Sequence, residues 1–318
     1  MTGTSDPGPQ LRPPARLDPL AVRRLLRHEG LRASHKLSQN FLADPDVLEE
    51  ILQQADAGLG DRVLEIGPGL GILTGSLLEA GAAVTAVEVD RRLAGLLRER
   101  HGPAIALGRE DPAAPGALTL IEGDALDQDL PGLVAPPFLV VANLPYHITS
   151  PILHRLLGTP PRAVRLVLML QWEVAERLAA PPGRMSYLSV FVQYQARVRI
   201  MRRVPAEAFE PAPSVASAIV VIEPHRPGPD AGVGAHLQAE DGVPRPVADE
   251  EALWTLVQAG FRERRKMIRN VLGRQLAVGQ ARVDAGLATA GIAGARRPQT
   301  LSVADWIALL DAMEGRRD

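Results

Sequence analysis

Cysteine is absent from this sequence of 318 residues. Its absence excludes disulfides, thiolate zinc sites, iron–sulfur clusters and a cysteine nucleophile, including the nucleophile that C5 methylation of pyrimidines requires. The sequence also lacks the run of about 18 apolar residues that a membrane span needs, and residues 1–19 lack the apolar stretch of a secretory signal. We therefore expect a cytoplasmic protein that uses neither thiol chemistry nor a membrane anchor.

A large excess of charge of either sign is also missing, because 35 Lys and Arg residues face 37 Asp and Glu residues. The resulting net charge of −2 argues against an indiscriminate nucleic-acid binder. The charges are nevertheless clustered, since residues 257–282 hold seven cations and one acid. Arginine predominates there, and its planar fork grips phosphate well. The candidates for contacting RNA are Arg264, Arg265, Lys266 and Arg269, with a solvated face as the alternative.

The length exceeds the roughly 150 residues of one comfortable core and indicates two domains of unequal size. Residues 1–19, rich in proline and glycine, are predicted to be a disordered tail. Residues 226–246 hold four glycines and four prolines and are predicted to be a linker or insertion. These segments separate a larger domain at 20–225 from a smaller one at 247–318.

Short apolar runs alternate with helical patterns in the larger domain, at 62–67, 83–88, 118–123, 138–144 and 166–171. This alternation is typical of βαβ units and predicts a parallel sheet. Two further runs, 192–204 and 216–224, are joined by a proline-rich loop and are predicted to form an antiparallel hairpin at the sheet edge. The fold class is therefore α/β, with a seven-stranded Rossmann-like sheet. The smaller domain is predicted to be all-helical, at 250–259, 263–275, 280–290 and 303–313, with Ser302 as an N-cap.

The first strand runs into three glycines spaced by single residues, Gly67, Gly69 and Gly71. Glycines there let the backbone approach a ligand, and Glu88 at the end of the next strand is placed to bind ribose hydroxyls. A dinucleotide fingerprint needs a third glycine where Ile72 stands. Glu65 at the strand end would repel a pyrophosphate and attract a cationic amino acid. These features favour S-adenosylmethionine as the cofactor over NAD, with an ordinary tight turn as the alternative.

Asp124 follows the third strand. Because the carboxyl ends of parallel strands line one crevice, its carboxylate is placed to accept a hydrogen bond from the adenine amino group of the cofactor. Aspartate is equally common as a helix N-cap, here for the segment that starts at Leu126. The sequence leaves both interpretations open.

The fourth strand ends in a sequence with a specific chemical use, Asn143, Leu144, Pro145 and Tyr146. An exocyclic amine is a poor nucleophile because its lone pair is delocalised into the ring. Acceptors on the Asn143 side chain and the Leu144 carbonyl would hold both N–H bonds out of the ring plane, and Pro145 would fix that carbonyl. Tyr146 would stack on a base that has left its helix. An ordinary Asn-x-Pro turn is the alternative.

With these residues assembled, the chain resembles the ribosomal RNA adenine N6,N6-dimethyltransferases, most closely their small-subunit branch. The resemblance begins at residues 35–42 (HKLSQNFL), where it assigns Asn40 and Leu42 to the cofactor site, and continues through the motifs above. It includes 170–180 and 208–225, where Phe209 matches the aromatic residue that closes over the target base. The C-terminal segments 261–273 and 297–306 resemble the family's small helical domain.

The resemblance implies repeated methyl transfer from S-adenosylmethionine to N6 of adjacent adenosines in the terminal hairpin of small-subunit rRNA. The substrate would be a pre-ribosomal particle, the enzyme a monomer, and no metal would be needed. Departures from the family pattern are Ser38, His147, a longer loop at 103–117 and a longer stretch at 226–246. The alternatives are a large-subunit rRNA dimethylase of the antibiotic-resistance type and a non-catalytic ribosome assembly factor.

Overall fold

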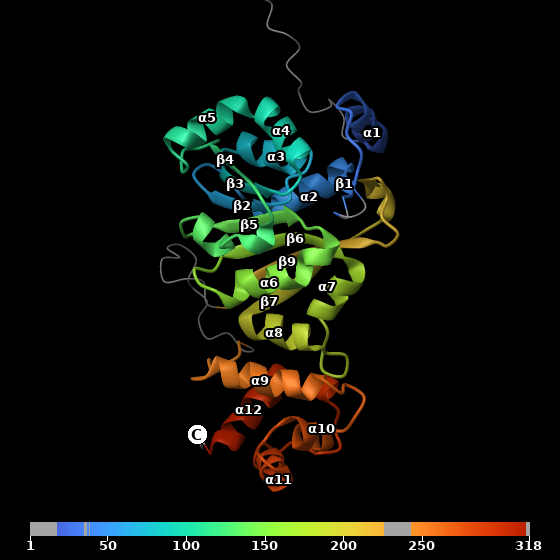
Figure 1. Ribbon diagram of the computed structural model, residues 1–318, viewed down its shortest axis with the longest axis vertical. Helices are drawn as coiled ribbons and strands as arrows, with labels where there is room; N and C mark the ends of the chain where they lie inside the picture. The colour runs from blue at the N-terminus through green and yellow to red at the C-terminus, as the bar shows by residue number, and fades with distance from the viewer. Residues whose placement is uncertain (1–17, 35–36, 38, 226–242, 316–318) are drawn as a thin grey trace, which may run out of the picture. The chain divides into compact units, whose positions relative to one another are not determined.

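The computed structural model of the protein describes residues 18–34, 37, 39–225 and 243–315 (Figure 1). Most of the predicted tail, residues 1–17, and of the predicted linker, residues 226–242, lies outside the described residues, as do His35, Lys36 and Ser38. Packing divides the chain into two compact units. Unit 1 holds the described residues up to Trp172 and Met201–Ile222, and unit 2 holds Glu173–Ile200 and the remaining C-terminal residues. A packing unit is not the same as a folding domain, so the domain division at 226–246 stays a prediction.

The predicted seven-stranded sheet is confirmed, with the order β4-β3-β2-β5-β6-β9-β7. Its strands are β2 (Arg62–Ile66), β3 (Ala83–Glu88), β4 (Leu118–Glu122), β5 (Leu139–Asn143), β6 (Arg165–Gln171), β7 (Ala196–Val204) and β9 (Ser217–Pro224). Strands β2 to β6 pair in parallel, whereas β9 is antiparallel to β6. A separate ribbon pairs β1 (Phe41–Leu42) with β8 (Phe209–Glu210).

The helices of the sheet region are α1 (Pro19–His28), α2 (Pro45–Ala55), α3 (Ile72–Glu79), α4 (Arg91–Arg100), α5 (Gly102–Glu110) and α6 (Thr149–Gly158). Short 3₁₀ turns lie at η2 (Ala125–Asp127), η3 (Leu130–Leu133), η4 (Tyr146–Ile148) and η5 (Ala206–Ala208). The expectation of a loop at 103–117 is wrong over its first part, because α5 occupies it. Pro103 suits the first turn of that helix, and a Cβ at Gly108 would come within 2.5 Å of the Leu118 carbonyl.

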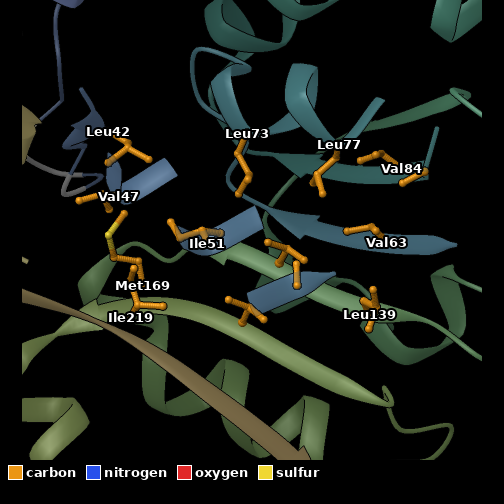
Figure 2. Packing of buried hydrophobic residues seen from close by; sticks show 14 of the residues in the cluster. Leu42, Val47, Ile51, Val63, Leu73, Leu77, Val84, Leu139, Met169 and Ile219 are labelled. Carbon is orange, nitrogen blue, oxygen red and sulfur yellow. The ribbon is translucent and has the colours of Figure 1, made fainter. Parts of the chain in front are cut away.

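The core of unit 1 is built where α2 and α3 pack on one face of the sheet (Figure 2). Ile51 of α2 and Leu77 of α3 point toward side chains such as Val63, Leu139 and Met169, which come from three neighbouring strands. The residues that alternate with these along the strands are also buried. Strands buried on both faces are typical of a parallel sheet covered by helices. Ligands therefore reach such a sheet at the carboxyl ends of its strands.

Unit 2 is mainly helical. Its helices are α7 (Trp172–Leu178), α8 (Tyr187–Gln195), α9 (Glu250–Phe261), α10 (Ile268–Gln275), α11 (Gln280–Thr289) and α12 (Val303–Glu314), with a 3₁₀ turn η6 at Pro298–Thr300. The first residue of α7, Trp172, belongs to unit 1. The predicted cap is confirmed, because the Ser302 side chain accepts from the Asp305 amide in a capping box. Among the described residues, no helix combines the length and the apolar composition that a membrane span requires.

Two predicted boundaries are wrong. Residues 192–195 belong to α8 and not to a strand, because a capping box at Ser186 starts this helix and its side chains are buried in the helical core. The predicted helix at 263–275 begins only at Ile268. Its amide donates to the Arg296 carbonyl at 2.7 Å, so it cannot bond to a preceding turn of helix, and residues 262–265 form a turn.

Candidate active site

A cavity opens at the carboxyl ends of β2, β3, β4 and β5. In open α/β sheets, ligands bind in the crevice at this end of the strands. Eleven residues assigned from sequence line it: Asn40, Leu42, Glu65, Gly67, Gly69, Glu88, Asp124, Asn143, Leu144, Pro145 and Tyr146. Segments separated by up to about a hundred residues thus meet in one cavity, because parallel strands end at the same edge of the sheet.

The glycine-rich turn after β2 has a backbone that other residues rarely adopt. Gly67, Gly69 and Gly71 have φ angles of 71°, 58° and 76°. A Cβ at Gly69 would come within 3.2 Å of the Phe41 ring, and one at Gly67 within 3.5 Å of Pro145. The turn therefore presents bare backbone to the cavity and packs directly against the motif that follows β5.

Glu65 is a buried carboxyl on the cavity wall, with 1% of its surface exposed. Its Oε2 accepts a hydrogen bond of 2.7 Å from Thr74 Oγ1. Burial raises the pKa of Glu65 to about 8, although the Thr74 hydrogen bond lowers it. A carboxyl in this state is neutral near pH 7 and becomes ionised most easily when a cation arrives beside it.

Glu88 is also buried, and both of its oxygens are engaged. Oε2 accepts from the Gly69 amide at 3.0 Å and Oε1 accepts from the Asp90 amide at 2.8 Å. Burial raises the pKa of Glu88, and the hydrogen bonds from these backbone amides oppose that effect. Each carboxylate oxygen can accept a second hydrogen bond. Glu88 can therefore bind hydroxyl groups while it also ties the glycine-rich turn to the end of β3.

Asp124 fulfils one of its two predicted roles directly. Its Oδ1 accepts a hydrogen bond of 2.8 Å from the Leu126 amide and caps η2. The residue is exposed and lines the cavity. The two interpretations are thus compatible, because one oxygen caps the turn while the carboxylate also borders the ligand space.

Asn143 lies at the last position of β5 with its side-chain amide anchored. Its Nδ2 donates a hydrogen bond of 3.1 Å to the backbone carbonyl of Asn40. Because the nitrogen is used in this way, the amide plane is fixed and Oδ1 remains as the acceptor. The side chain therefore presents an oxygen whose direction is set before any substrate binds.

Tyr146 occupies the first position of η4, directly after Pro145. Its ring is half-buried on the cavity wall, and its hydroxyl lies 2.9 Å from Ser217 Oγ. Burial raises the pKa of Tyr146, and the Ser217 hydrogen bond lowers it. His147 next to it is exposed and also lines the cavity.

Two residues assigned from sequence do not line this cavity. A Cβ at Gly71 would come within 2.6 Å of Leu97 and 3.0 Å of His101, so Gly71 serves the packing of α3 against α4. Phe209 is 2% exposed, pairs with Leu42 across the β1–β8 ribbon and belongs to the hydrophobic core. The contact that the resemblance implies between Phe209 and a target base would require this ribbon to rearrange.

The four cations assigned to RNA differ in their surroundings. Arg264, Arg265 and Lys266 are exposed in the turn between α9 and α10, and within the described residues their side chains form no ion pair. Arg269 instead forms two hydrogen bonds of 2.7 and 2.8 Å with Asp284. The three unpaired cations line a surface depression together with Arg262, Glu263 and Gln299.

Three residues that the sequence did not single out hold groups of the site in place, and of these Phe41 itself lines the cavity. Thr74 holds Glu65, Phe41 covers Gly69, and Ser217 contacts Tyr146. Phe41 and Ser217 both lie in segments that carry the family resemblance, but a motif does not reveal which partner a side chain meets. No group of three or more His, Asp and Glu side chains in the described ranges is arranged to hold a metal ion.

Comparison with known proteins finds similarity over most of the chain. The sequence profile of the ribosomal RNA adenine dimethylase family matches residues 30–314. A protein named ribosomal RNA small subunit methyltransferase A from Anaeromyxobacter sp. (strain K) is 42% identical over 300 residues, which cover 90% of this chain and 95% of that protein. The protein of the same name from Geobacter sulfurreducens is 38% identical over 292 residues, covering 89% and 96%.

Solved structures give the same result. A dimethyladenosine transferase from Plasmodium falciparum superposes with a TM-score of 0.62 and 25% identity, covering 85% of this chain and 95% of that one. The 23S rRNA methyltransferase ErmE superposes with a TM-score of 0.61 and 27% identity, covering 86% and 100%. Both similarities extend over most of the two chains.

Proposed function

The chain belongs to the ribosomal RNA adenine dimethylase family, and from this premise we propose that it dimethylates N6 of adjacent adenosines in the terminal hairpin of small-subunit rRNA. The observation that supports this proposal most directly is the anchored side-chain amide of Asn143, which lines the same cavity as the glycine-rich turn. The small-subunit target is favoured over a large-subunit one by the curated relatives at 38% and 42% identity, compared with 27% for ErmE.

The residues around the glycine-rich turn suit S-adenosylmethionine as the cofactor. A buried carboxyl at Glu65 matches the ammonium group, the free acceptor capacity of Glu88 matches ribose hydroxyls, and Asp124 Oδ2 matches the adenine amino group. The left-handed glycines leave space for close backbone contact. When bound, this cofactor supplies a methyl group on a positively charged sulfur.

The motif after β5 is suited to activating the target amine. Asn143 Oδ1 and the Leu144 carbonyl would accept the two N–H bonds of adenine N6 and direct its lone pair out of the ring plane. This contribution is orientation and electrostatic stabilisation in a sheltered site, and it requires no general base before attack. The proton is lost to solvent once the new N–C bond has formed and the amine has become acidic.

Tyr146 would hold the base itself. An adenine must leave its stack to enter this cavity, and an aromatic ring on the wall offers a stacking surface in return. Outside the cavity, Arg264, Arg265 and Lys266 would contact RNA phosphate, because they are exposed and unpaired within the described residues. We further propose that the enzyme acts as a monomer on a nearly assembled small-subunit particle.

Mass spectrometry of particle RNA tests this function. Small-subunit and large-subunit particles from a strain lacking the enzyme would be incubated separately with the protein and S-adenosylmethionine, and their adenosines analysed before and after. We expect two adjacent N6,N6-dimethyladenosines in the small-subunit terminal hairpin. Methylation of large-subunit RNA alone would favour the antibiotic-resistance branch, and binding without any methylation would favour an assembly factor.

A further inference from the structure

Among the described residues, Tyr146 has a single polar side-chain partner, and that partner lies 71 positions later in the chain. The Tyr146 hydroxyl lies 2.9 Å from Ser217 Oγ. The short turn η4 that carries Tyr146 has no side-chain cap at its start. The orientation of the ring is therefore governed by its packing and by this one hydrogen bond.

Ser217 is held firmly enough to serve as an anchor. It is the first residue of β9, it is fully buried at 0% exposure, and it lies opposite Gln171 in β6. The residue before it, Ala216, accepts a hydrogen bond of 2.9 Å from the Trp172 amide. A hydroxyl on such a rigid strand constrains the group that it contacts.

The antiparallel direction of β9 explains why this residue reaches the site. Parallel strands present only their final residues at the carboxyl edge of the sheet, where the cavity opens. Because β9 is antiparallel to β6, its first residue lies at that same edge. The strand thus brings a buried hydroxyl to the tyrosine from outside the cavity lining.

We propose that Ser217 is a positioning residue for methyl transfer, because its buried hydroxyl holds Tyr146 in the orientation that receives the target base. This inference rests on the proposed function. Ser217 itself does not line the cavity, so it acts through Tyr146 and does not touch the base. The neutral Tyr146 hydroxyl can either donate to or accept from Ser217 Oγ.

A double-mutant cycle separates positioning from a general structural role. Ser217→Ala, Tyr146→Phe and the double variant of the full chain would be compared in single-turnover methylation of unmethylated small-subunit particles. We expect each single variant to lose about tenfold in rate, with the affinity for S-adenosylmethionine within about twofold. The double variant should be no slower than the slower single variant, because both changes remove the same hydrogen bond.

Ser189→Ala is the control for losing a buried hydroxyl. Ser189 is also 0% exposed and donates to the Arg177 carbonyl in unit 2. We expect this variant to lower the melting temperature without the tenfold loss of rate that we expect for Ser217→Ala. Losses that multiply in the double variant, or a normal rate for Ser217→Ala, would overturn the proposal.

Nuclear magnetic resonance gives a second measurement that needs no catalytic activity. The chain has three tyrosines, so ring-labelled tyrosine gives few signals, and Tyr146→Phe identifies the signal of interest. We expect Ser217→Ala to shift the Tyr146 ring signals and to leave those of Tyr187 and Tyr194 in place. An unshifted Tyr146 signal would refute positioning even in an active enzyme, whereas inactivity of the wild type on particles would refute the proposed function alone.

Discussion

Asn143 and Asn40 lie 103 residues apart in the chain, and the Asn143 Nδ2 donates to the Asn40 carbonyl at 3.1 Å. The bond fixes the side-chain amide of Asn143 and directs its oxygen away from Asn40. It also joins the segment that precedes β1 to the end of β5, and both line the cavity. An oxygen that is oriented in advance needs no reorganisation during the reaction, which is the condition for strong electrostatic catalysis.

Replacing Asn143 by alanine should therefore affect the rate far more than cofactor binding. Removing one oriented group from a sheltered site commonly costs on the order of a hundredfold to a thousandfold in turnover. The Leu144 carbonyl cannot hold both N–H bonds of the amine alone. We expect that loss in single-turnover methylation with saturating particles, and an S-adenosylmethionine affinity within a few-fold of normal by calorimetry.

Asn143→Asp is the matched variant, since it keeps an acceptor oxygen but cannot donate to the Asn40 carbonyl. We expect it to be slow as well, because the carboxylate is repelled by that carbonyl and loses its fixed orientation. An Asn143→Ala protein that transfers methyl at the normal rate would remove this residue from the mechanism.

Cofactor affinity should rise with pH because of Glu65. The free carboxyl has its pKa raised by burial to about 8, and a bound ammonium favours the ionised form. Binding below pH 8 therefore releases a proton from Glu65, and the association constant should increase by up to about tenfold per pH unit between pH 6 and 7.5. Calorimetry in buffers of different ionisation enthalpy measures the released proton directly.

Glu65→Gln provides the control and should remove the contribution of Glu65 to this slope. The ligand-free protein gives an independent check. A folded pKa raised above the unfolded value of 4.5 gives stability that is fully present below pH 4.5 and is lost as the pH rises through about 8. Wild type should therefore melt at a lower temperature at pH 9 than at pH 6, and Glu65→Gln should show less of this decrease. Identical pH profiles for the two proteins would contradict the assignment.

Glu88→Ala should weaken cofactor binding by about 1.5–3 kcal/mol, the scale of lost charge-assisted hydrogen bonds. The variant also loses the bonds to the Gly69 and Asp90 amides, so we expect a lower melting temperature too. Calorimetry with S-adenosylhomocysteine and its 2′-deoxy analogue separates these effects. If Glu88 binds the ribose, the two ligands should differ in affinity for the wild type and bind the variant with equal affinity. An equal difference in affinity in both proteins would show that Glu88 only holds the Gly69 and Asp90 amides and does not bind the ribose.

The unpaired cations of unit 2 should control the salt dependence of RNA binding. Replacing Arg264, Arg265 and Lys266 by serine should weaken particle binding and reduce the slope of log K against log salt by about 2–3, because each phosphate that is no longer neutralised lowers the slope by close to one. Filter binding over a range of salt concentrations measures this slope.

Arg269→Ser serves as the comparison, because Arg269 is already paired with Asp284. We expect a smaller change in slope for it than for the average of the three unpaired cations. An unchanged slope in the triple variant would show that this turn is a solvated surface.

Local sequence patterns were sufficient to predict most of the secondary structure of this protein. Apolar runs separated by helical patterns predicted the five parallel strands, because a βαβ alternation is typical of a parallel sheet. The remaining two strands of the sheet were predicted from two runs joined by a proline-rich loop. The chemical roles proposed for the residues around Gly69 and Asn143 could also be predicted from residue type and spacing. Boundaries were less predictable: α8 replaced the start of a predicted strand and α10 began five residues late, because capping and tertiary hydrogen bonds decided them.

Only the tertiary structure decided which of these groups meet, and in what state. Sequence placed Asn40 and Asn143 at one site, but the bond between them depends on how two distant segments pack. Burial, which no motif encodes, raised the pKa of Glu65 and placed Phe209 in the core. Sequence therefore determined which chemical groups are available, because residue type and local pattern are written in it. The fold determined their orientation, charge and access, because these depend on neighbours that are remote along the chain.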